Sequence, residues 1–137
     1  MTTQALIESV ATALHEAWRE LCLGEDPKAS RFSRLPDGDA VDILQTSFEH
    51  LPLSLQGENL QAARHILLFL ESHPGAPLEV AAAEVHQAWL SRHPDADEAL
   101  RVPYPQLAES EKNKDRQIVL IAQRAMRDSS TGQTGAK

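Results

Sequence analysis

The stretch Leu14-His15-Glu16-Ala17-Trp18 decides the fold, because it recurs as Val85-His86-Gln87-Ala88-Trp89 and the two copies hold both tryptophans of the chain. Residues 7–18 align with residues 78–89 without a gap, and the alignment also pairs Glu8 with Glu79. Self-similarity of this kind is typical of a duplicated supersecondary unit. We therefore expect two repeats, each opened by a helix with a His-x-x-Trp pattern.

A second match follows each of these helices, at matching spacing: an aromatic residue, a leucine, a serine, then an asparagine or aspartate. Its members are Phe48, Leu51, Ser54 and Asn59 in the first half and Tyr104, Leu107, Ser110 and Asp115 in the second. The connector before the aromatic residue is longer in the first half, residues 19–47 against residues 90–103. We expect one repeat over 1–73, a second over 74–128 and a disordered tail over 129–137, with a pseudo-twofold axis relating the repeats.

The periodicity of apolar residues predicts an all-α fold. Apolar residues recur at intervals of three and four from Ile7 to Leu21, and Thr3 is a suitable N-cap. Further helices are expected from Ser54, from Pro77 and from Ser110, the last burying Ile118, Val119, Ile121 and Ala122. In the first connector, Asp37 or Asp39 is expected to cap a short helix that includes Val41, Leu44 and Phe48. Alternating β-branched runs are absent, so no strand is expected.

Composition narrows the classes of partner. The 137 residues carry a net charge of −7, which disfavours binding to a phosphate backbone, so no nucleic acid is expected. The sequence has neither an apolar run long enough for a membrane span nor a secretory leader. A single cysteine, Cys22, excludes an intrachain disulfide and fits a reducing compartment. We expect a cytoplasmic protein and leave its oligomeric state open.

No catalytic or metal-binding pattern stands out. His15-Glu16 does not begin a His-Glu-x-x-His motif, because Arg19 occupies the place of the second histidine. The six histidines lack the spacing of zinc ligands, and Cys22 has no second thiol near it. A glycine-rich phosphate loop is absent as well. We therefore expect a protein that is not an enzyme and has no metal or cofactor.

The His/Trp pairs allow two interpretations. On one helix, residues three apart stand on the same edge, so an imidazole can bond a connector carbonyl while the indole packs beneath it. The favoured interpretation is that His15/Trp18 and His86/Trp89 are buried staples that fix each helix to its connector. The alternative is that the two pairs line a cleft between the repeats and stack on a planar ligand.

The second half also resembles a known family. After the His86-x-x-Trp89 pattern it carries His93-Pro94, Val102-Pro103-Tyr104, Leu107, Ser110-Glu111-Lys112 and Asp115-Arg116. This order is similar to that of the RyR domain, the repeat found in ryanodine receptors and in small bacterial and phage proteins. The first half matches more loosely, since it lacks the Val-Pro-Tyr and Glu-Lys elements, and both halves lack the Gly-Trp-x-Tyr-Gly element that usually follows His-x-x-Trp.

The resemblance implies an all-helical pair of repeats that acts as an accessory or sensor module, in some prokaryotic cases associated with nucleotide signalling. Eight residues, called here the predicted binding residues, are the candidates for a site: His15, Trp18, His86, Trp89, Tyr104, Lys112, Asp115 and Arg116. The leading hypothesis is a small, planar, anionic, nucleotide-like ligand in the cleft between the repeats. The alternative is a protein-interaction module without a small ligand. For Asp115 and Arg116 the favoured interpretation is structural: they bond the backbone of the connector and hold Pro103-Tyr104 against the helix.

Overall fold

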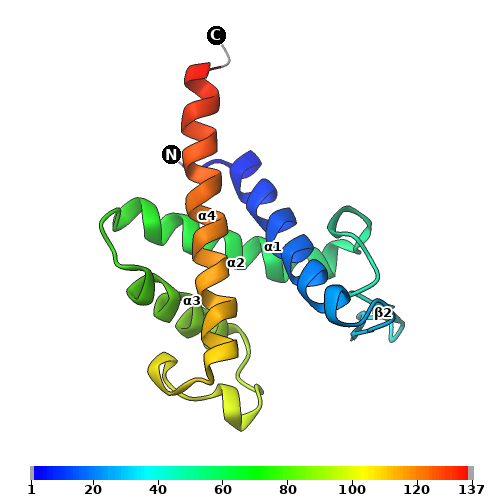
Figure 1. The fold of residues 1–137 in the computed structure, drawn as a ribbon. Coiled ribbons are helices and arrows are strands. Elements are labelled where there is room, and N and C mark those ends of the chain that lie inside the picture. Colours follow the sequence, from blue (N-terminus) through cyan, green and yellow to red (C-terminus); the bar gives the residue numbers. More distant parts are fainter. Residues whose placement is uncertain (1, 136–137) are drawn as a thin grey trace.

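The structure, a computed structural model, describes residues 2–135, with side chains described for residues 2–129. It is mostly helical, as expected, with one small hairpin where no strand was expected. The elements are α1 (Gln4–Glu25), β1 (Phe32–Arg34), β2 (Ala40–Asp42), α2 (Leu53–Ser72), α3 (Leu78–Arg92) and α4 (Glu109–Gly135), with short 3-10 helices η1 (Phe48–His50), η2 (Glu98–Leu100) and η3 (Tyr104–Gln106) (Figure 1). The predicted tail falls almost wholly on residues whose side chains lie outside the described part, and it stays a prediction.

The helix starts follow the sequence closely. The Thr3 hydroxyl accepts a hydrogen bond from the backbone N–H of Leu6, 3.1 Å away, which confirms Thr3 as the N-cap of α1. Helices α2 and α4 each begin five residues after an aromatic residue, at Leu53 after Phe48 and at Glu109 after Tyr104. The break at residues 73–77 separates α2 from α3, as predicted.

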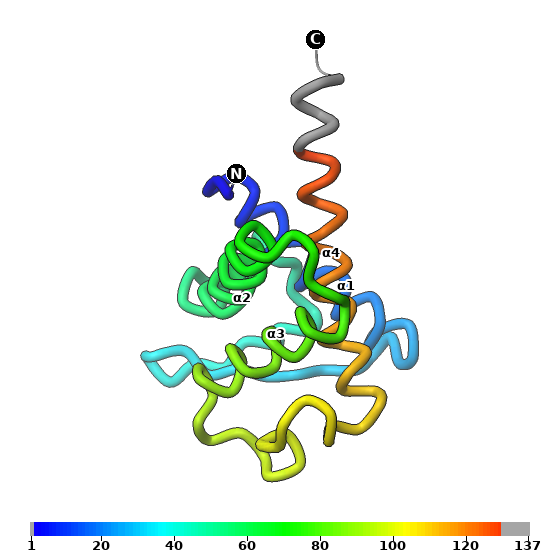
Figure 2. Tube along the Cα trace, turned by 90° about the vertical axis from the view of Figure 1, so that its left-hand side faces the viewer, coloured from blue at the N-terminus to red at the C-terminus, as the bar shows by residue number. Residues whose placement is uncertain are grey.

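Packing follows the pattern expected of two related halves. Within each half the two long helices pack together, α1 on α2 and α3 on α4; across the halves α1 packs on α4 and α2 on α3. Figure 2 shows α2 and α3 one above the other, with α4 rising beside them. The largest fully buried side chains, Val10, Ile66, Leu67 and Val119, come from α1, α2 and α4. This is the arrangement that a pseudo-twofold axis would produce, and the axis itself stays a prediction.

The first connector was predicted wrongly. Instead of a short helix after Asp37 or Asp39, the chain forms an antiparallel hairpin in which Phe32 pairs with Asp42 and Arg34 with Ala40. The turn between the strands places Gly38 at φ +97°, a left-handed conformation that glycine adopts without strain. The signal was present in Leu35-Pro36-Asp37-Gly38, a sequence typical of turns. The hairpin occupies the extra length of this connector.

Candidate functional site

His15 is buried and bonded to its connector. Its side chain is 4% exposed, and its Nε2 lies 2.8 Å from the carbonyl oxygen of Thr46. Because a carbonyl only accepts hydrogen bonds, Nε2 must carry the hydrogen. The ring packs between Trp18, with centroids 5.7 Å apart, and Phe48, with centroids 6.1 Å apart. This imidazole therefore holds α1 against η1.

His86 repeats the arrangement in the second half. It too is 4% exposed, and its Nε2 donates to the carbonyl of Val102 at 2.7 Å. In both halves the accepting carbonyl lies two residues before the aromatic residue that opens a 3-10 helix, Phe48 or Tyr104. The staple interpretation of the histidines is thus confirmed. It also means that the Nε2 atom of each is occupied within the chain.

The tryptophans are half-buried, so the prediction that both indoles are buried is wrong. The guanidinium of Arg31 stands 5.8 Å from the centre of the Trp18 ring. Trp89 stacks on His93 with ring centroids 4.5 Å apart. A partly buried indole covered on one side by a cation or an imidazole packs at the edge of the fold, whereas the neighbouring histidine fills its interior.

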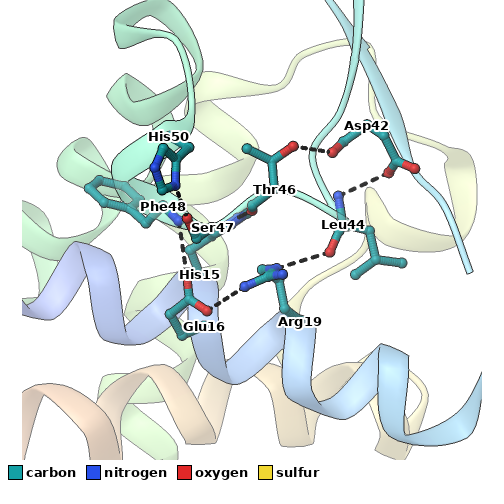
Figure 3. Close-up of polar contacts among 9 residues, drawn as sticks. All are labelled: His15, Glu16, Arg19, Asp42, Leu44, Thr46, Ser47, Phe48 and His50. Carbon is teal, nitrogen blue, oxygen red and sulfur yellow. Dashed lines mark hydrogen bonds and ion pairs between the residues drawn. The ribbon is translucent and has the colours of Figure 1, made fainter. Parts of the chain in front are cut away.

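The carboxylate of Glu16, whose role was not predicted, ties α1 to the connector of the first half (Figure 3). Glu16 accepts the backbone N–H of Phe48 at 2.9 Å and the guanidinium of Arg19 at 2.6 Å, and Arg19 also donates to the carbonyl of Leu44 at 2.9 Å. Burial alone would raise the pKa of Glu16, but the bonds from Phe48 and Arg19 outweigh it and lower that pKa. Glu16 was seen only as part of a metal motif that fails, so its role was missed.

Beyond Glu16, the carboxylate of Asp42 orders the chain that follows the hairpin. It accepts the backbone N–H groups of Arg31 and Leu44 at 3.0 and 3.2 Å, while the Asp42 carbonyl accepts the Thr46 hydroxyl at 2.7 Å. These bonds satisfy backbone groups that no regular element pairs. They hold in place the carbonyls of Leu44 and Thr46, which accept hydrogen bonds from Arg19 and His15 of α1 (Figure 3).

In the second half the lock is an ionic cluster around Arg116. Its guanidinium donates to both carboxylate oxygens of Glu79, at 2.7 and 3.0 Å, and further to Glu109 and Asn113. Glu79 also accepts the Tyr104 hydroxyl at 2.9 Å. Arg116 lowers the pKa of Glu79, and burial together with Glu79 raises the pKa of Tyr104. The prediction that Arg116 bonds the connector backbone is wrong, because its partners are side chains.

Asp115 likewise lies near a side chain, His86, and not in a bond to the connector backbone as predicted. Its carboxylate lies 3.9 Å from Nδ1 of His86, and its side chain is 14% exposed. Burial, with a smaller effect of the neighbouring Glu111, raises the pKa of Asp115 to about 7, while Lys114 acts in the opposite direction. The first half has Asn59 at the matching position, a side chain of the same shape that cannot ionise.

Asp115→Asn should therefore stabilise the protein above neutral pH. A carboxyl group whose pKa is raised on folding contributes stability that is fully present below its unfolded pKa and is lost as the pH rises through about 7. We expect the variant to gain about 1 to 2 kcal/mol at pH 8, since water still reaches part of the group, and the gain to vanish near pH 4. Urea denaturation from pH 4 to pH 9 measures this difference, and a gain that does not depend on pH would contradict the assignment.

The remaining predicted residue, Lys112, places its ammonium group 5.8 Å from the centre of the Tyr104 ring. Lys112 belongs to the second half, as do His86, Trp89, Tyr104, Asp115 and Arg116, whereas His15 and Trp18 belong to α1 in the first half. The structure has one pocket between α1 and α4 and another between α2 and α3, and none of the eight predicted binding residues lines either of these two.

A groove of about 860 Å³ lies instead between α1 and α4. One wall, from α1, carries small side chains one helical turn apart, at Ala5, Ser9, Ala13 and Ala17. The other wall comes from α4 and includes Leu120, 43% exposed, Ile121 and Ala125. Charged side chains stand along its length at Glu16, Glu20, Arg124 and Asp128.

The matching joint in the other half is closed. Extending the two alignments pairs α1 with α3 and α4 with α2, so the counterpart of the groove is the joint between α3 and α2, where the pocket measures only about 10 Å³. There His65 bonds Glu84 at 2.7 Å, and Arg92 bonds Glu58 at 2.9 Å.

The residues that align with these bridges cannot form them in the groove. Ala13 aligns with Glu84 and Ile121 with His65, while Leu21 aligns with Arg92 and Lys114 with Glu58. The first bridge is therefore replaced by two apolar residues, and the second by one apolar residue and a lysine. Within residues 2–129, no side-chain hydrogen bond or ion pair given by the structure joins α1 to α4. α1 and α4 are in contact, as α2 and α3 are, and the groove is the outer side of their joint, which no such bridge covers.

Among the residues with described side chains, no three His, Cys, Asp or Glu groups are placed to hold a metal ion. Across the described helices, none offers a stretch long and apolar enough to cross a membrane. Comparison with family models, curated proteins and solved structures found no match to this chain.

Proposed function

We propose that this protein is a non-enzymatic interaction module that binds a segment of another protein in the groove between α1 and α4. The observation that carries the proposal is the contrast between the two joints, one of about 860 Å³ and one of about 10 Å³. Two packed helices gain stability by covering the apolar side chains along their joint, so a joint whose outer side leaves Leu120 43% exposed and carries no bridge suits a surface that a partner completes.

The polar groups of the predicted binding residues favour the same choice over a small anionic ligand. The Nε2 atoms of His15 and His86 are bonded to carbonyls, and Arg116 is surrounded by Glu79, Glu109 and Asn113. An anion at this edge would have to displace two carboxylates from one guanidinium, at the cost of a bidentate bond. The RyR-like resemblance is compatible with either occupant and is itself a prediction.

The double variant Lys112→Ala/Arg116→Ala distinguishes the protein-interaction hypothesis from the small-ligand hypothesis. We expect the melting temperature to fall clearly, because Glu79 loses its main partner and Tyr104 its fixed acceptor. Binding of a peptide in the groove should survive at a temperature where the variant is folded. A double variant that keeps the melting temperature of the wild type but abolishes binding of a nucleotide in a thermal-shift panel would favour the small-ligand hypothesis.

A selection experiment tests the groove directly. A displayed library of helical peptides is panned against the wild type alone, and the enriched peptides are then measured on the wild type and on Ala13→Glu, an exposed position in the middle of the groove. We expect enriched peptides that lose about tenfold or more in affinity for this variant, because a carboxylate would be buried without a partner. Thr12→Glu is the matched control, since Thr12 is exposed on α1 but outside the groove. Peptides that bind Ala13→Glu as well as the wild type would refute the proposal.

A further inference from the structure

We infer that the occupant of this groove is one amphipathic helix of a partner protein, lying antiparallel to α1 with basic residues in its N-terminal turns. The inference rests on the proposed function and adds the shape, direction and charge of the partner. Three features of the groove carry it: its length, its row of small side chains and the placement of its charges.

Length and width fit a helix. Residues 3–20 of the chain border the groove, and at a rise of 1.5 Å per residue they span about 25 Å, the length of a helix of about 17 residues. Ala5, Ser9, Ala13 and Ala17 repeat every fourth residue and so form one ridge of small side chains. Such a ridge lets the backbone of a second helix approach closely, with its own larger side chains set against Leu120 and Ile121.

The charges set the direction. Glu16 and Glu20, one turn apart, stand at the end of the groove that faces the C-terminal half of α1. Arg19 and the Phe48 N–H hold Glu16 in place and keep it ionised. The N-terminus of a helix carries partial positive charge and therefore prefers this end. Lysine or arginine in its first turns adds direct pairing with Glu20, which is exposed.

Charge also favours a different protein over a second copy. The charged residues lining the groove are three carboxylates and one guanidinium, from Glu16, Glu20, Asp128 and Arg124. The chain as a whole carries a net charge of −7, so two copies repel each other. A basic helix is attracted by both the groove and the whole chain.

The test uses two synthetic peptides of about 18 residues with the same Leu/Ala stripe, one with Lys and one with Glu in the polar positions of the first two turns. Fluorescence anisotropy measures the binding of each to the full chain. We expect the Lys peptide to bind about tenfold or more tightly than the Glu peptide, and Glu20→Lys to reduce that preference to near unity. Glu8→Lys makes the same charge change on α1 outside the groove and should leave the preference within about twofold.

The outcomes separate this inference from the proposed function. If both peptides bind equally and both are lost with Ala13→Glu, the groove is an interaction surface and the charge inference is overturned. If neither peptide binds and light scattering shows a dimer that Ala13→Glu dissociates, the occupant is a second copy and the inference is overturned. If neither binds and the chain is monomeric with and without Ala13→Glu, the groove receives no helix and both proposals are overturned.

Discussion

Replacing His86 by alanine is expected to lower the free energy of unfolding by about 3 kcal/mol. The imidazole is 4% exposed, so its removal leaves a cavity, and the carbonyl of Val102 loses the donor that now lies 2.7 Å away. Each effect is worth about 1 to 3 kcal/mol when a group is buried. Urea denaturation followed by circular dichroism measures the loss.

The chain supplies both a parallel test and a control for this substitution. His15→Ala should cost a similar amount, because His15 has the same exposure and the same bond, to Thr46. His50→Ala should cost less than about 0.5 kcal/mol, since His50 is exposed and bonds only the side chain of Ser47. A His86 variant as stable as the His50 variant would show that the imidazole does not hold the connector.

Leu67→Ala should be at least as damaging, with an expected loss of about 3 to 4 kcal/mol. Leu67 is fully buried in α2, the helix that packs against α1, α3 and α4. Its neighbour Leu68 is 42% exposed, and Leu68→Ala should cost less than about 1 kcal/mol. The midpoints of urea unfolding of the two variants give the comparison. Similar losses at both positions would mean that α2 does not occupy the centre of the core.

The sequence predicted the arrangement of the main helices because the two repeats align with each other residue by residue. Once His15 aligns with His86 and Phe48 with Tyr104, the bonded connector and the helix that follows take the same places in both halves. The fold class and the role of the histidines were therefore accessible. Such local patterns recur because each repeat packs the same helix against the same kind of connector.

The hairpin and the ionic cluster were not predicted, for different reasons. The turn at Pro36-Asp37-Gly38 was visible, but it was outweighed by the apolar residues at Val41 and Leu44, which suggested a helix. The cluster of Arg116 with Glu79 joins residues far apart in sequence, and no spacing rule connects them. Tyr104 and Arg116 are replaced by Phe48 and Leu60 in the first half, so the duplication gave no second example.

The groove was also beyond reach of the sequence, because it depends on how α1 and α4 sit against each other. What the sequence did contain is the contrast between Ala13 and Glu84 and between Ile121 and His65. These differences acquire meaning only when the aligned helices are seen to form equivalent joints, one bridged by His65 and Glu84 and the other open.

The most direct test of the account is the map of amide chemical-shift changes when the Lys peptide is added to the isotope-labelled protein. We predict that the changes fall on residues 3–20 and 117–129, the two walls of the groove, and that they disappear with Ala13→Glu. Changes centred on Tyr104, Lys112 and Arg116, or on the closed joint between α2 and α3, would contradict the assignment of the groove as the interaction surface.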